Sequence, residues 1–193
     1  MTPPPSLRRA ASGTLTAGLL GLAASSPGIA QSRDAIGDAT LPLPETDRAA
    51  ATVLVREAGA WRMARTGAGP FVCLADDPGE EGFHVACYHE SLEPYMARGR
   101  ELAAAGVSGR ESLARRWKEI EDGTLAMPEG PSALRSLTAD SGWDGDPGAL
   151  QRLTVLYVPY ATPEELGLPT EPAEGVPWLM FPGKPTAHLM IHR

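Results

Sequence analysis

Lysine and aromatic side chains are scarce in this chain of 193 residues: two of the 17 basic residues are lysine, and 6% of all residues are aromatic. Acidic residues number 24, so the formal net charge is −7. This acidic balance argues against a nucleic-acid-binding protein, in which lysine and arginine cluster. The apolar share of 42% excludes a disordered chain. The lack of any period of about 20–50 residues excludes a repeat protein.

Motifs typical of enzymes are absent as well. The sequence has no G-x-S-x-G motif, no glycine-rich phosphate-binding loop and no C-x-x-C pair. The run His89-Glu90-Ser91-Leu92-Glu93 resembles the zinc-binding H-E-x-x-H motif, but Glu93 stands in place of the second histidine ligand. The simpler interpretation is a strand-to-helix junction. The sequence therefore leaves any catalytic residue unidentified. Paired carboxylates of a glycoside hydrolase stay open, because their separation is spatial.

The one long apolar run lies near the N-terminus, where residues 1–30 have the zones of a secretory signal peptide. Arg8 and Arg9 supply a positive region, residues 10–24 are apolar and small, and Gly28-Ile29-Ala30 offers a cleavage site. The apolar run is shorter than the ~20 residues needed to span a bilayer. We therefore expect export, by the general secretory or the twin-arginine route. The mature chain would have no membrane span and would lie in the periplasm or outside the cell.

The composition of the mature chain changes near residue 50. Residues 31–49 are polar and contain Pro42 and Pro44, which predicts a linker or a loosely docked arm. Short β-prone runs separated by turn residues follow, which predicts a single α+β domain over residues 50–193. The first part of this domain is expected to be an antiparallel meander of four strands, at residues 52–55, 61–65, 71–74 and 83–88.

Two helices are expected after this meander. Ser91 is the predicted N-cap of the first, and Ser108 with Glu111 forms the S-x-x-E capping box of the second. Thr162 is expected to cap a later single helical turn. The β pattern resumes around that turn, with predicted strands at residues 133–137 and 153–159 and a final hairpin of residues 178–181 and 187–192.

Cys73 and Cys87 are the only cysteines. Residue 80 is their midpoint and lies in the loop between two expected strands, so a symmetrical hairpin places them directly opposite each other. Their Cα atoms are then within reach of a disulfide, and export supplies the oxidising compartment. The sequence therefore predicts a disulfide that closes the hairpin. The alternative is a metal site of Cys73, His84, Cys87 and His89, which strand parity opposes because His84 points to the other face.

A second candidate metal site lies in the last expected strand. His188, Met190 and His192 alternate along the chain and so share one face. A thioether beside imidazoles suits copper, and two neighbouring positions are close enough to chelate one ion. The alternative is an ordinary strand at the end of the domain.

Three stretches of the mature chain carry a further resemblance: Phe71–Leu74 with Cys87–His89, Leu92–Arg100, and Pro177–Met180 with His188–Met190. In these stretches the chain resembles an uncharacterised family of exported bacterial proteins. The resemblance implies export, and it brings no known activity, substrate or cofactor. No functional residue is therefore carried over from it.

The leading hypothesis is an exported, non-catalytic α+β domain that binds a small ligand or a partner protein in the cell envelope. It needs no cofactor and does not bind nucleic acid. The expected ligand-binding residues are His89, Arg98, Trp178 and His188, provided that the last hairpin packs near the start of the first helix. The alternative is a metal-dependent enzyme or a copper-binding protein with histidine, methionine and carboxylate ligands.

Overall fold

The computed structural model describes residues 34–140 and 143–192. The predicted signal peptide, residues 1–30, lies outside the described residues. The elements follow one another as α1 (Ala35–Ala39), α2 (Glu45–Arg48), β1 (Thr52–Glu57), β2 (Ala60–Arg65), β3 (Phe71–Leu74), β4 (Phe83–His89), the 3-10 turn η1 (Glu90–Leu92), α3 (Glu93–Ala104), α4 (Gly109–Glu121), β5 (Ser132–Ala139), the 3-10 turn η2 (Pro147–Ala149), β6 (Gln151–Tyr157), α5 (Pro163–Leu166), β7 (Trp178–Met180) and β8 (His188–His192). None of the described helices is both long enough and apolar enough to cross a membrane.

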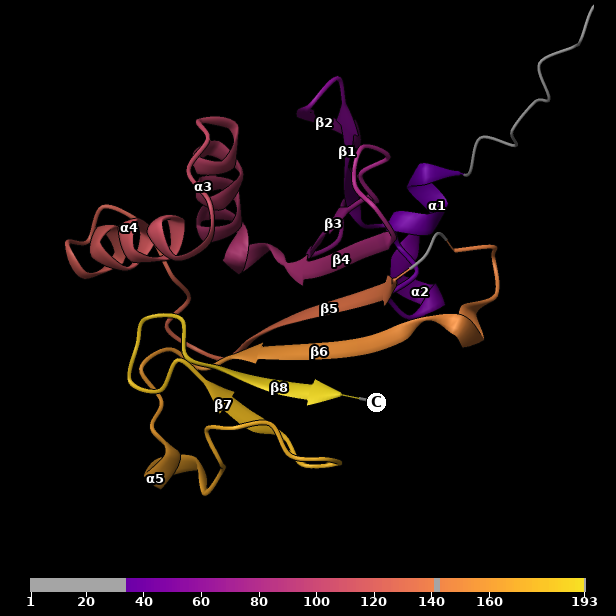
Figure 1. Ribbon diagram of the computed structural model, residues 1–193. Helices are drawn as coiled ribbons and strands as arrows, with labels where there is room; N and C mark the ends of the chain where they lie inside the picture. Colours follow the sequence, from indigo (N-terminus) through magenta and orange to yellow (C-terminus); the bar gives the residue numbers. More distant parts are fainter. Residues whose placement is uncertain (1–33, 141–142, 193) are drawn as a thin grey trace, which may run out of the picture. The chain divides into compact units, whose positions relative to one another are not determined.

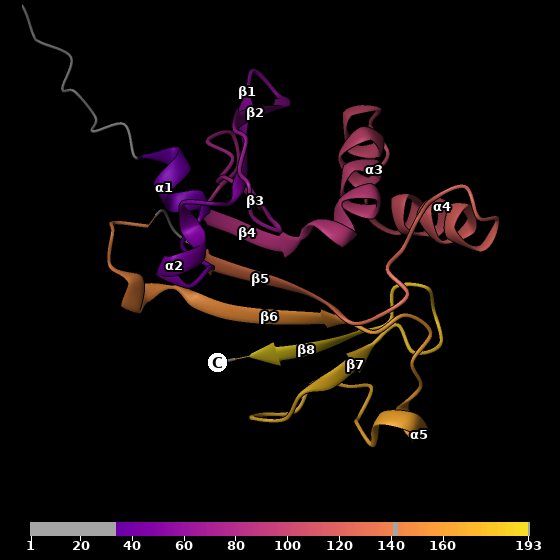
Figure 2. The ribbon, with the colours of Figure 1, turned by 180° about the vertical axis from the view of Figure 1, so that it is seen from behind.

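The strands form one eight-stranded sheet in the order β2-β1-β3-β4-β5-β6-β8-β7 (Figure 1). Neighbouring strands are antiparallel except for β1 and β3, which are parallel. Strands β5, β6 and β8 lie side by side in both ribbon views, and β7 is at the far edge (Figures 1 and 2). The structure confirms a mixed α+β fold built on a mostly antiparallel sheet.

The first four strands lie close to their predicted positions, but they do not form a consecutive meander. Strand β3 pairs in parallel with β1, so two hairpins are joined side by side. The connection after β2 crosses the start of β1, where the Gly69 N–H donates to the Ala50 carbonyl at 2.8 Å. A Cβ at Gly67 would lie 2.1 Å from that carbonyl oxygen, so the crossing needs glycine there. The chain thereby reaches the other side of β1 and runs in the same direction.

The β3–β4 hairpin confirms the predicted cysteine pairing. Cys73 lies opposite Cys87 in the ladder, with Cα atoms 4.1 Å apart, and the two form a disulfide. Both half-cystines are fully buried. The disulfide is therefore part of the core beneath one face of the sheet.

The segment that the sequence predicts as a linker or arm is folded onto this same face. Ala39 and Leu43 are buried there in a cluster with Val53, Cys73 and Cys87. These apolar side chains, spaced four apart, explain why a polar-looking segment docks on the sheet. In the ribbon views α1 and α2 lie beside the start of β4, whereas α3 and α4 lie beyond its end (Figures 1 and 2).

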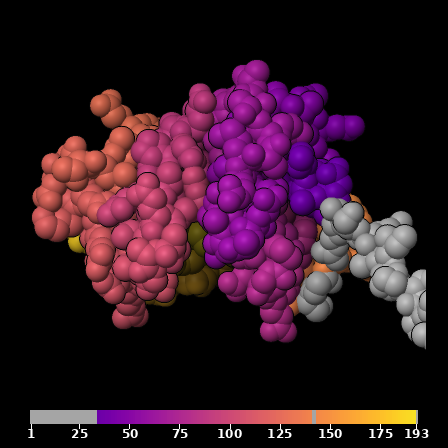
Figure 3. Space-filling view, turned by 90° about the horizontal axis from the view of Figure 1, so that it is seen from above, coloured from indigo at the N-terminus to yellow at the C-terminus, as the bar shows by residue number. Residues whose placement is uncertain are grey.

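Helices α3 and α4 belong to the opposite face, where Leu92, Tyr95 and Ile120 pack with Leu54 and Val155. Two bonds from Arg98 to Glu119, of 2.7 and 2.9 Å, join the helices. Seen from above, the residues of the helix pair lie beside those of the N-terminal strands, and C-terminal residues are visible between the two over part of their boundary (Figure 3).

The predicted helix starts are confirmed in part. Thr162 caps α5 in a complete capping box with Glu165. The predicted capping box of Ser108 and Glu111 does not form: the Ser108 side chain makes no cap hydrogen bond, and the Glu111 carboxylate accepts from Arg115 at 2.6 Å. Helix α3 begins at Glu93, after the extra turn η1.

Candidate functional site

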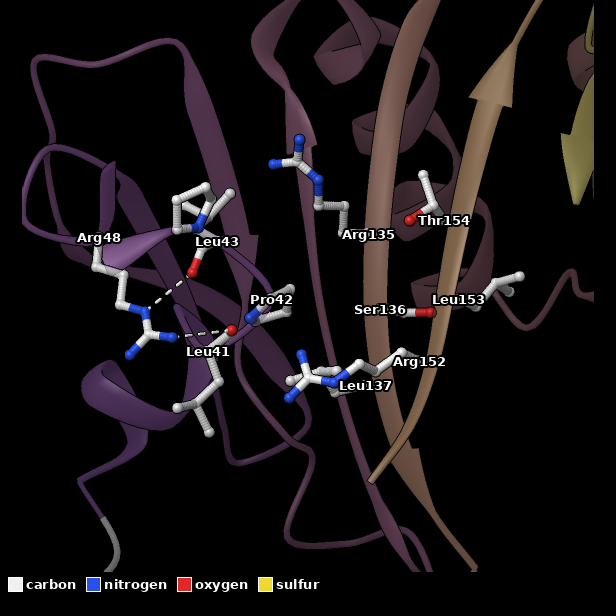
Figure 4. A pocket seen from close by; sticks show the side chains of 11 residues that line it. Leu41, Pro42, Leu43, Arg48, Arg135, Ser136, Leu137, Arg152, Leu153 and Thr154 are labelled. Carbon is white, nitrogen blue, oxygen red and sulfur yellow. Dashed lines mark hydrogen bonds between the residues drawn. The ribbon is translucent and has the colours of Figure 1, made fainter. Parts of the chain in front are cut away.

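A cavity of about 440 Å³ lies between the segment that follows α1 and the middle of strands β5 and β6 (Figure 4). We call it the arginine pocket, because three arginines line it and no aspartate or glutamate does. Its volume is in the range of small-molecule sites, about 300–1,000 Å³. Its lining residues are Leu41, Pro42, Leu43, Pro44, Arg48, Arg135, Ser136, Leu137, Arg152, Leu153 and Thr154.

Sheet register brings Arg135 and Arg152 to the same face. Arg135 pairs with Thr154 across β5 and β6, and Leu137 pairs with Arg152, so the arginines are diagonal neighbours. Arg135 also pairs with Cys87 on β4, which places both arginines on the face that carries the disulfide and Leu43. Their side chains extend from the two strands towards the 41–44 segment (Figure 4).

Arg48 holds the outer wall of the arginine pocket. Its Nε donates to the Leu43 carbonyl at 3.0 Å, and its Nη2 donates to the Leu41 carbonyl at 3.3 Å. Arg65 donates in turn to the Arg48 carbonyl at 2.5 Å and to the Ala51 carbonyl at 3.0 Å. These bonds satisfy carbonyl groups of a segment without regular structure and fix its course over the sheet.

Arg135 and Arg152 are different from Arg48, since the side chain of neither has a hydrogen-bond, ion-pair or ring partner among residues 34–140 and 143–192. Arg135 is half-buried and Arg152 is exposed. A half-buried guanidinium without a counter-charge loses hydration and gains little in return. The arginine pocket therefore has a positive potential that nothing in its lining neutralises.

A second cavity, of about 450 Å³, has the opposite charge. Its lining includes Asp76, Glu80, Glu81 and His84 beside Trp61. Among the described residues, no three histidine, cysteine, aspartate or glutamate side chains are placed to hold a metal ion. The cavity is therefore an acidic surface hollow.

The four residues predicted to bind a ligand do not share one surface. His89 lies on the face of Cys87 by strand parity, whereas His188 and Trp178 lie on the face of Met190 and Val155. Arg98, on α3, is engaged by Glu101 and Glu119. The His89 ring bonds to Ser91 at 2.8 Å. No hydrogen bond, ion pair or ring contact joins any two of the four within the part of the chain that the structure describes.

Some of the predicted metal ligands have other partners. Both cysteine sulfurs are committed to the disulfide, so they are not thiolate ligands for a site with His84 and His89. His188, Met190 and His192 do share one face of β8, as predicted. His188, however, bonds through Nδ1 to the Thr186 carbonyl at 2.7 Å and is buried, whereas His192 is exposed at the strand end.

His188 belongs to a cluster of rings under the helix pair. Its ring centroid lies 5.1 Å from that of Tyr157 and 5.6 Å from that of Phe181. Trp117 of α4 contacts Phe181 and donates to the Thr186 hydroxyl at 2.7 Å. Burial lowers the pKa of His188, partly offset by its bond to the Thr186 carbonyl. The cluster is therefore a packed connection between α4 and β8.

This burial predicts a pH dependence of stability. The unfolded chain protonates His188 near its ordinary pKa of 6.5, whereas the folded chain does so at lower pH. The free energy of unfolding should therefore fall as the pH drops from about 7 to 5, and this slope should be smaller in His188→Gln. Urea unfolding at several pH values measures both slopes. His192→Gln, at an exposed position of the same strand, should keep the wild-type slope; an unchanged slope in His188→Gln would contradict the assignment.

Sequence reasoning did not select the arginines of the pocket. The available signal was weak: Arg135 lies inside the predicted strand 133–137, and Arg152 directly precedes the predicted strand 153–159. Their shared face depends on the β5–β6 register and on the docking of residues 41–44, which the local pattern does not show.

Comparison of the chain with protein-family models, with curated proteins and with solved structures finds no match. The resemblance to exported bacterial proteins therefore stays a prediction from the sequence.

Proposed function

We propose that the protein is an exported binding domain that takes a small organic anion in the arginine pocket. One observation carries this proposal: Arg135 and Arg152 enter the same cavity without a counter-charge among the described residues. The sequence has no G-x-S-x-G motif, no glycine-rich phosphate-binding loop and no complete H-E-x-x-H motif, which supports binding rather than catalysis.

Most of the other described arginine side chains have an interaction partner, in contrast to Arg135 and Arg152. In an acidic chain, arginine readily finds a carboxylate or a carbonyl. The described arginines that have such a partner or an aromatic ring are Arg48, Arg56, Arg62, Arg65, Arg98, Arg100, Arg115 and Arg116. Over the described ranges, Arg110 is the one other arginine without a partner, and it is exposed at the start of α4.

The chemistry of the lining selects the class of ligand. A guanidinium offers planar, paired N–H donors that match a carboxylate or phosphate edge. Leu41, Pro42 and Leu43 form an apolar wall opposite the arginines. Such a wall limits water and strengthens a charge–charge contact. The arginine pocket therefore suits an anionic group attached to an apolar body.

Export is supported by the disulfide, since disulfides persist mainly outside the cytoplasm. The signal-peptide pattern of residues 1–30 supports it independently. Intact mass of the protein from the periplasm or medium should match a chain that starts at Gln31 and is two hydrogens lighter than its reduced form. A full-length chain with two free thiols in the cytoplasm would contradict export.

Anion binding is tested by calorimetric titration at low salt with sodium glutarate, sodium pentanoate and inorganic phosphate. We expect at least one of these probes to bind the wild type, and the double substitution Arg135→Gln with Arg152→Gln to weaken it at least tenfold. The reason is that a hydrogen bond to a charged group contributes about 1.5–3 kcal/mol. Added salt should weaken binding in the wild type.

The matched control is Arg110→Gln, which removes one positive charge at an exposed position outside the arginine pocket. It should keep the wild-type affinity within about twofold. If none of the three probes binds, or if the double variant binds as the wild type does, the arginine pocket is not an anion site.

A further inference from the structure

Provided that the proposed anion binding holds, the positions of Arg135 and Arg152 indicate the shape of the ligand as well as its charge. They are diagonal neighbours across the β5–β6 ladder, because Arg135 faces Thr154 and Arg152 faces Leu137. Side chains in such positions start about 7–8 Å apart. The guanidiniums then diverge: that of Arg135 lies level with Leu43, and that of Arg152 lies towards Leu41 (Figure 4). Two separate positive ends thus face one cavity.

The surface between the two guanidiniums is apolar. Pro42 lies between them in the close-up view, and Leu137 adjoins Arg152 (Figure 4). Both Pro42 and Leu137 are buried and line the cavity. The Thr154 hydroxyl, opposite Arg135, has no hydrogen-bond partner among the described residues and can donate to an oxygen held there. The lining therefore has two polar ends and an apolar middle.

Charge neutralisation separates the classes of anion. A monoanion held by one guanidinium leaves the other uncompensated, and the two positive groups repel each other. Inorganic phosphate puts its charges on one centre, which suits two groups that converge and not two that diverge. A molecule with an anionic group at each end neutralises both arginines at once.

We infer that the arginine pocket recognises a small dicarboxylate, in which a short apolar chain joins two carboxylates. One carboxylate pairs with Arg135 and Thr154, and the other pairs with Arg152, while the chain lies against Pro42 and Leu137. The same lining accepts a ligand in which one end is a phosphate monoester, since the guanidinium geometry fits either group.

The test compares glutarate with pentanoate, which have the same number of carbon atoms and differ by one carboxylate. Calorimetry at equal ionic strength should show glutarate binding at least tenfold more tightly. Arg135→Gln and Arg152→Gln should each bring the affinity for glutarate close to that for pentanoate. Arg135→Lys and Arg152→Lys keep the positive charge and most of the side-chain stem, so they should give intermediate affinities for glutarate. They also distinguish the loss of a guanidinium contact from unfolding of the variant.

The outcomes separate this inference from the proposed function. Equal binding of glutarate and pentanoate, with one arginine alone responsible, would overturn the two-carboxylate inference and leave anion binding in place. If inorganic phosphate binds most tightly of the probes, the two arginines converge on one group. That result would also overturn the two-carboxylate inference and leave anion binding in place. A further probe is the phosphate monoester of 3-hydroxypropionate. If it binds better than glutarate and needs both arginines, the ligand has two anionic ends and one of them is a phosphate. Failure of every probe would remove both proposals.

Discussion

A variant with alanine at both Cys73 and Cys87 is expected to lose about 3 kcal/mol of unfolding free energy. The cross-link closes a loop with a sequence separation of 14 residues, and the chain-entropy model gives about this value for a loop of roughly 15 residues. Both sulfurs are buried beside Ala39 and Leu43. The loss should therefore also weaken the docking of the segment that forms the outer wall of the arginine pocket. Urea unfolding of the variant and the wild type measures the difference.

Reduction of the wild-type protein provides the matched control for the cysteine variant. The reduced wild type keeps both side chains and loses only the bond, so it should unfold at nearly the same urea concentration as the variant. A cysteine variant within about 1 kcal/mol of the oxidised wild type would show that the disulfide contributes little.

Leu92→Ala is expected to lower the free energy of unfolding by about 2–5 kcal/mol, the usual cost of emptying a fully buried leucine site. Leu92 has no exposed surface and lies in the turn that leads from β4 into α3. It packs in the cluster that holds the helix pair on the sheet, with Tyr88 and Tyr95. The expected result is a large shift of the urea midpoint with an unchanged slope, because the variant should keep two-state unfolding.

Leu166→Ala is the matched control for Leu92→Ala, since it removes the same atoms from a side chain that is 37% exposed at the end of α5. Its unfolding free energy should stay within about 0.5–1 kcal/mol of the wild type. Equal effects of the two substitutions would contradict the placement of Leu92 in the core.

Local signals predict most of the elements and one part of the tertiary structure. Turn residues and β-prone runs mark the strands because such signals act within a few residues. The pairing of Cys73 with Cys87 follows from symmetry about the loop, which is also local. The parallel pairing of β1 with β3 could not be predicted from the sequence. The residues around Gly67 have the pattern of an ordinary turn, and the close approach of Gly67 to Ala50 is seen only in three dimensions.

The candidate site could not be predicted from the sequence either, because it is formed by residues that are distant in the chain. Arg135, Arg152 and Leu43 come from three separate parts of the chain, and the docking of Leu43 brings them together. Histidine side chains can bind ligands or metals, but His188 is packed among rings and His89 bonds to Ser91 in the adjoining turn. A residue type capable of chemistry does not by itself predict a cavity, because position in the register decides which side chains meet.

The most direct test of anion binding in the arginine pocket is a titration of ¹⁵N-labelled protein with glutarate, followed by NMR of arginine Nε–H and backbone amide signals. The Nε–H signals of Arg135 and Arg152 and the amides of residues 41, 43 and 154 should shift together and saturate, while the Nε–H signal of Arg110 stays in place. Shifts confined to residues around His188 and Trp178, or no saturating shift at either arginine, would contradict the proposed site.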